Sequence, residues 1–284
     1  MESKIAKAID LKHNPVAVVL ADRKPDNALQ FKPGKWGCVM FLFADAAKGK
    51  TAAFDAQTYG CWGGGVGLGF GNTYEQFPGG VDCLTRFVSS GNKQWEKGQQ
   101  VAKELAETVG KEFADDFLEG ERYLKSPELV DQRLNNLPIT EIKSNYVIFK
   151  PLSEIDPGVE QPETVVFTVD GDQLSALIIL ANYAKASTEN VVTPYSAGCQ
   201  AIGILPWHEA KSANPRAVVG LTDISARKNV RELLGAEYFS FAMPWKMFLE
   251  MESNVEGSFL ERSTWQSLQE PRRAQDMDKR AIYV

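Results

Sequence analysis

The sequence predicts an α/β or α+β fold, a mixed sheet with flanking helices. Short, continuously apolar runs bounded by proline or acidic residues, such as 16–20, are typical of strands buried on both faces. Runs rich in β-branched and aromatic residues predict further strands at 146–149 and 164–169. Segments with apolar residues three or four positions apart lie between the strands, and this alternation indicates an α/β or α+β domain.

The first half of the chain supplies clear start and stop signals. The apolar segment 38–47 predicts a buried helix that ends at the turn 48–50. Ser126 followed by Pro127 predicts the start of another helix, because serine is a preferred N-cap residue and proline is favoured at the first helical position. The other elements expected here are helices at 2–12 and 93–125, the latter interrupted near Gly110 and Gly120, and strands at 16–20 and 51–54.

In the second half, Asp170 directly follows the strand 164–169 and is placed to cap a helix with one apolar face. The remaining predicted elements are a buried helix or strand at 201–205, a strand at 217–221, a helix that Ser225 caps and that runs to Leu234, a strand at 238–242 and a helix after Pro244. The polar residues 262–284 predict a tail that is loosely held or binds a partner.

Composition limits the domain organisation and the class of partner. A chain of 284 residues predicts a single domain over 1–261, and the pattern is compatible with two related halves, about 10–140 and 141–261, before the tail. A net charge of -6 without clustered Lys or Arg excludes nucleic acid and anionic membranes as expected partners. No run of about 18 apolar residues occurs, so we expect a cytoplasmic protein. Aromatic residues near the C-terminus, Trp245, Phe248 and Trp265, are compatible with a homo-oligomer.

Half of the residues in the segment 59–72 are glycine. Such a stretch either takes positive φ or comes very close to another part of the chain. One interpretation is a backbone cradle for a cofactor, made by Gly60, Trp62, Gly63 and Gly64. The other is a close crossing with a helix or loop, which the absence of a Gly-x-Gly-x-x-Gly or Gly-Lys-Ser/Thr pattern favours over nucleotide binding.

The four cysteines are the candidate metal ligands. Cys38, Cys61 and Cys199 each follow a glycine, and Cys83 does not. Backbone N–H groups and close approach at glycine-rich turns favour thiolate ligands. Four cysteines suffice for an iron–sulfur cluster or a tetrahedral zinc site, although no pair has Cys-x-x-Cys spacing. Buried structural cysteine is the alternative interpretation.

A weak internal repeat places Gly37-Cys38 on Gly198-Cys199. In both copies an apolar segment, a small turn and a strand follow the cysteine. Position 61 then lies opposite Thr222, so one copy has a second cysteine and the other does not. A duplicated unit that faces itself across one site would have this pattern.

Together these features resemble the DUF169 family over roughly residues 10–250. The resemblance rests on Pro15-Val-Ala-Val, Gly37-Cys38, Gly60-Cys61 with the Leu-Gly-Phe that follows, Asp172-Gln173 and Gly198-Cys199. It implies a cytoplasmic α/β protein with cysteines in these loops, often from anaerobes, and this favours an iron–sulfur cluster over zinc. Many relatives have a further cysteine where this chain has Val219, so Cys83 is the candidate fourth ligand.

We therefore expect an iron–sulfur protein with redox or iron-assisted chemistry on a small molecule, its substrate or redox partner unidentified. The alternative is a metal-free protein that binds a small ligand or acts as an accessory or regulatory protein. Among other polar residues, Arg86 could bind a carboxylate or form an ion pair with Asp82 or Glu75. His208 follows a tryptophan in a segment near Cys199, and His13 is expected in a solvated loop.

Overall fold

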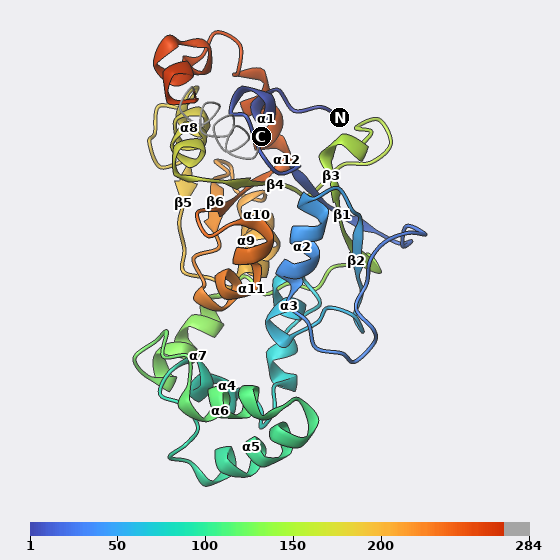
Figure 1. Ribbon diagram of the computed structural model, residues 1–284, viewed down its shortest axis with the longest axis vertical. Helices are drawn as coiled ribbons and strands as arrows, with labels where there is room; N and C mark the ends of the chain where they lie inside the picture. The colour runs from blue at the N-terminus through green and yellow to red at the C-terminus, as the bar shows by residue number, and fades with distance from the viewer. Residues whose placement is uncertain (270–284) are drawn as a thin grey trace, which may run out of the picture. The chain divides into compact units, whose positions relative to one another are not determined.

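The computed structural model describes residues 1–269, and the last fifteen residues of the predicted tail lie outside them (Figure 1). The chain separates into two compact units. One contains the residues up to Leu68 and those from Ile142 onward, and the other is the inserted segment 69–141. All strands of the sheet belong to the first unit.

The first unit is built on a seven-stranded mixed sheet, which confirms the predicted fold class. The strands are β1 (Val16–Ala21), β2 (Ala52–Phe54), β3 (Tyr146–Pro151), β4 (Thr164–Val169), β5 (Val191–Val192), β6 (Ala217–Gly220) and β7 (Phe239–Pro244). Their order across the sheet is β2-β3-β1-β4-β7-β6-β5. Every pair is antiparallel except β5 and β6, which are parallel.

One face of the sheet packs on α1 (Lys4–Ala8), α8 (Gly171–Asn182) and α12 (Trp245–Ser253). Asp170 caps α8 in a capping box with Gln173, as the sequence predicts for the cap. Trp245, Phe248 and Trp265 are all buried in this core. Core packing therefore accounts for these aromatic residues, and the oligomeric state stays a prediction.

The first residues of the predicted tail are packed rather than loose. Residues 263–269 are helical, and a short 3₁₀ turn, η3 (Phe259–Glu261), precedes them. The indole Nε1 of Trp265 donates a hydrogen bond of 2.9 Å to the carbonyl oxygen of Ala8, the last residue of α1. The hydrogen bond holds residues 263–269 against α1, although the two segments are far apart in the sequence.

The opposite face of the sheet is covered by α2 (Val39–Ala47), α9 (Gly198–Ile202) and α10 (Ile204–Glu209), with α3 (Trp62–Gly67) and α11 (Ile224–Leu234) packed on these helices. Figure 1 draws α2, α9 and α11 beside one another. Phe43 of α2 contacts Phe149 of β3 edge to face, with ring centroids 6.2 Å apart. The segment 201–205, predicted as helix or strand, is helical on both sides of Gly203.

The strand order is symmetric about the centre of the sheet, and the two related halves stay a prediction. From the centre of the sheet outward, β1, β3 and β2 on one side mirror β4, β7 and β6 on the other. Each neighbouring pair on both sides is antiparallel, and so is the central pair β1–β4. The sheet divides between its neighbouring strands β1 and β4, and along the chain this division falls in the connection from β3 to β4, with the segment 69–141 inserted in the first half.

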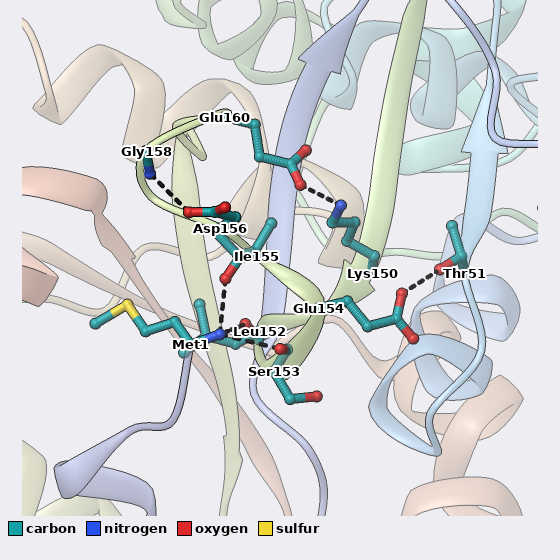
Figure 2. A network of polar contacts seen from close by, with 10 residues as sticks. All are labelled: Met1, Thr51, Lys150, Leu152, Ser153, Glu154, Ile155, Asp156, Gly158 and Glu160. Atoms are coloured by element: carbon teal, nitrogen blue, oxygen red, sulfur yellow. Dashed lines mark hydrogen bonds and ion pairs between the residues drawn. The ribbon is translucent and has the colours of Figure 1, made fainter.

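The connection between β3 and β4 contains the 3₁₀ turn η2 (Leu152–Glu154) and lies beside the first residue of the chain. Figure 2 shows the amine of Met1 pointing at three carbonyl oxygens, those of Leu152, Ser153 and Ile155, at 3.2, 3.0 and 2.7 Å. In the same network, Lys150 of β3 pairs with Glu160. These contacts fix the crossing from one half of the sheet to the other.

The inserted unit is helical. It contains the 3₁₀ turn η1 (Thr73–Gln76), α4 (Val81–Val88), α5 (Glu96–Thr108), α6 (Lys111–Glu119) and α7 (Pro127–Asn136). The predicted helix 93–125 is indeed interrupted at Gly110, and Ser126 caps α7 through its hydroxyl. The core of the inserted unit is a stack of aromatic rings from Phe77, Phe87 and Phe117.

Candidate metal site

Three of the four cysteines lie at the starts of three helices in the first unit. Cys38 is the N-cap of α2 and Cys61 the N-cap of α3, while Cys199 is the second residue of α9. The helix α9 packs against both α2 and α3. Segments that are far apart in the sequence therefore bring the glycine-flanked thiols into one region, which we call the three-thiol site.

Two of the sulfurs form hydrogen bonds to the glycine-rich helix itself. The Cys61 Sγ accepts a hydrogen bond of 3.3 Å from the backbone N–H of Gly64. The Cys199 Sγ donates one of 3.1 Å to the carbonyl oxygen of Gly63. The glycine backbone of α3 thus lies between the two thiols and contacts both.

The predicted cofactor-binding residues Gly60, Trp62, Gly63 and Gly64 lie next to Cys61 in the sequence, and part of this glycine-rich stretch is helical. Residues Trp62–Gly67 form α3, so Trp62, Gly63 and Gly64 are helical and Trp62 is partly exposed. Gly60 has φ of 82°, and a Cβ on it would lie 2.2 Å from the carbonyl oxygen of Gly37. The two Gly-Cys pairs therefore touch through their glycines, where no side chain fits.

Glycine also sets how closely α3 approaches α9. A Cβ on Gly67 would lie 2.7 Å from the Cys199 Sγ and 2.8 Å from the backbone N of Gln200. Real Cβ atoms do not come this close to backbone, so only glycine allows this approach. The structure therefore contains the close helix crossing, and the cofactor cradle of Gly60, Trp62, Gly63 and Gly64 stays a prediction.

The surroundings of the thiols raise their pKa values. Burial raises the pKa of Cys61 to about 12, with a further contribution from the charge of Cys38. Burial also raises the pKa of Cys199 well above its ordinary value, and Cys61, Cys38 and Asp223 add to this. For Cys38, burial raises the pKa and a hydrogen bond from the Asn229 side chain opposes it. All three are neutral thiols near pH 7 until a cation takes the place of their protons.

Asp223 is the residue of this region that the sequence analysis missed. It is the N-cap of α11, a role that we predicted for Ser225, and it accepts a hydrogen bond of 2.8 Å from the Ser225 N–H. Burial raises the pKa of its carboxyl group, and hydrogen bonds from the N–H groups of Ala226, Ser225 and Gly198 oppose this. An aspartate two residues after the predicted strand 217–221 and just before a helical segment is a capping signal that could have identified it.

Cys83 belongs to the inserted unit and not to the unit that contains the other three. It lies on α4 and is buried, with Gly79 so close that a Cβ there would lie 2.2 Å from the Cys83 Sγ. Nearby, the guanidinium of Arg86 lies over the ring of Trp95, 4.6 Å from its centroid. This cation–π contact is a structural role for Arg86.

His13 differs from its prediction, and His208 lies beside a groove. His13 is half-buried rather than solvated, because its Nε2 lies 3.0 Å from the carbonyl oxygen of Leu234 and its ring packs on Tyr238. The groove has a volume of about 480 Å³, and an ion pair of 2.6 Å between Arg216 and Glu209 forms part of its wall. Its lining consists of Val192, Thr193, Pro194, Leu205, His208, Glu209, Arg216 and Val218.

Two further observations concern the described residues, 1–269. No group of three or more His, Cys, Asp or Glu side chains there is arranged so that it could hold a metal ion as the side chains stand. None of the helices in this part of the chain is long and apolar enough to cross a bilayer.

Comparison with known proteins gives a family and no relative of established activity. The DUF169 family, described as Uncharacterised ArCR, matches residues 4–254. No match was found among the curated proteins or among the solved structures. The family match spans both halves of the sheet, the inserted unit and all four cysteines. The chain therefore belongs to the DUF169 family.

Proposed function

We propose that Cys38, Cys61 and Cys199 hold an iron–sulfur cluster, and that the protein uses it for redox or iron-assisted chemistry on a small molecule in the cytoplasm. The observation that supports this is the meeting of three glycine-flanked thiols at three helix starts. Cysteine thiolates are the usual ligands of such clusters. Donor chemistry therefore fits this cofactor better than a hard, oxygen-binding cation.

The backbone around the thiols suits negatively charged sulfur. The N–H of Gly64 already points at the Cys61 Sγ, and helix starts carry partial positive charge that stabilises thiolates. Binding requires the Cys199 thiol to lose its proton and release the carbonyl oxygen of Gly63. Rotation of short side chains at the three helix starts is the adjustment that we expect on loading.

A bound cluster would supply electron transfer or a Lewis-acidic iron. The residues of this chain would set which of the two occurs. Four thiolates, with Cys83 as the fourth, suit electron transfer. Three thiolates leave one iron without a cysteine ligand, and a small molecule could bind there.

The test is the iron and acid-labile sulfide content of protein purified without oxygen, with its absorption spectrum. We expect wild-type protein to contain both, and Cys61→Ser and Cys199→Ser to lose most of them, because each removes a ligand. Unchanged metal content in both variants contradicts the proposal. Cys83→Ser is the matched comparison. If this variant loses as much iron and sulfide as the other two, Cys83 is also a ligand. If its iron and sulfide content equals that of wild type, Cys83 is not a ligand.

The groove beside His208 favours a second function, the binding of a small ligand without metal. Its wall contains the partly exposed side chain of Arg216. The guanidinium can bind the carboxylate of a ligand if that carboxylate replaces Glu209 in the ion pair. Iron-free wild-type protein that binds small carboxylates, with binding lost in Arg216→Ala, would support this function over the first.

A further inference from the structure

The Asp223 carboxylate lies near two of the three thiols, Cys38 and Cys199. Asp223 accepts hydrogen bonds from the N–H of Ser225 on its own helix and from the N–H of Gly198, the residue before Cys199. Its charge acts on both Cys38 and Cys199. Asp223 thus joins the start of α11 to the start of α9 and places an acidic side chain at the same site.

The symmetry of the sheet gives Asp223 a counterpart. Strands β2 and β6 occupy equivalent positions in the two halves, and each leads into a helix, α3 or α11. Cys61 is the N-cap of the first helix and Asp223 is the N-cap of the second. The sequence repeat pairs Cys61 with Thr222. When the two helices are aligned by their N-caps instead, Cys61 pairs with the next residue, Asp223.

Starting from the proposed iron–sulfur function, we propose that Asp223 is the fourth protein ligand and binds, through a carboxylate oxygen, the iron that has no cysteine in this unit. The two halves would then each supply two ligands, Cys38 with Cys61 and Cys199 with Asp223. A carboxylate is a harder ligand than a thiolate and binds iron in such clusters less firmly. If a cluster is bound in this way, Asp223 would be its most easily replaced protein ligand, and an oxygen-containing small molecule would bind at that iron.

The experiment compares Asp223→Asn and Asp223→Cys with the control Asp170→Asn in protein purified without oxygen. Asparagine caps helices as well as aspartate does, so Asp223→Asn keeps the cap of α11 and removes the charged ligand. Asp170 is also a helix N-cap, on α8, and its replacement by Asn reports any general effect of the change.

We expect Asp223→Asn to release iron to a chelator at least about tenfold faster than wild type, while Asp170→Asn matches wild type. Asp223→Cys should retain the cluster with a shifted visible spectrum, because a thiolate replaces an oxygen. The proposal is overturned if Asp223→Asn keeps the wild-type spectrum and release rate, or if Cys83→Ser alone produces the expected loss. Wild-type protein without iron and sulfide instead overturns the proposed function itself.

Discussion

The Cys61 thiol illustrates how a single residue is controlled by what surrounds it. Its sulfur lies at a helix start, which favours a thiolate, yet burial and the neighbouring Cys38 raise its pKa to about 12. Burial is therefore the larger effect in the metal-free protein. A bound cation would reverse this balance, because a coordinated thiol is deprotonated outright.

The raised pKa predicts a pH dependence of stability for metal-free protein. In the unfolded chain the thiol ionises near pH 9, whereas in the folded chain it stays neutral to about pH 12. The folded state is thus favoured below pH 9, and this contribution is lost as pH rises from 9 to 12, by roughly 1 kcal/mol at pH 10. Urea titration at pH 8 and pH 10 measures this. We expect the free energy of unfolding to fall less in Cys61→Ala than in wild type between these pH values, because the variant lacks the titrating thiol. Equal losses in the two proteins would contradict the burial of this thiol.

At the scale of elements, α3 is a helix that its own sequence disfavours. Four of its six residues are glycine, each of which costs about 1 kcal/mol relative to alanine in a helix interior. The helix forms because glycine lets α9 approach closely, which alanine would prevent. Tertiary packing therefore overrides local propensity in this segment.

Gly67→Ala tests this explanation. The added Cβ would meet the Cys199 Sγ and the backbone of α9, so we expect a loss of about 1–3 kcal/mol in the free energy of unfolding. The displacement of α9 should also lower the iron content. The control is Gly171→Ala in α8, where a Cβ meets nothing within 4 Å and the change should be neutral or slightly stabilising. Urea titration of both variants checks this, and equal effects would refute a specific role for close approach.

At the scale of the molecule, the inserted unit 69–141 is separable from the sheet. It has its own aromatic core, and its two ends are joined by a hydrogen bond of 3.2 Å from the N–H of Gly71 to the carbonyl oxygen of Thr140. The ends of the insertion are therefore close enough for a short linker to bridge them. The strands and the three-thiol site all lie outside it.

Replacing residues 69–141 by a short Gly-Ser linker should leave a protein that folds and unfolds cooperatively. Its iron content should match that of the full chain where Cys83 is not a ligand, and should fall by the same amount as in Cys83→Ser where it is. Circular dichroism with thermal unfolding measures the first expectation, and iron analysis the second. A molten or insoluble product would show that the two units depend on each other for stability.

Much of the secondary structure followed from the sequence. Buried strands such as 16–20 are continuous apolar runs, and the helices after Ser126 and Asp170 begin at capping residues whose signal is local. The helical conformation of Trp62–Gly67 could not be predicted, because its cause is the approach of α9 and not its own residues. The cap of α11 was placed two residues late because Ser225 and Asp223 are both good caps.

By itself, the sequence determined the fold class, the family and the cysteines worth attention, because apolar periodicity, caps and glycine–cysteine pairs are local patterns. Only the tertiary structure decided which of these residues lie together. It brought Cys38, Cys61 and Cys199 to adjoining helix starts, separated Cys83 into another unit and added Asp223. The physical reason is that proximity across more than 100 residues depends on sheet order and on helices that approach through glycine, and neither is written in any short segment.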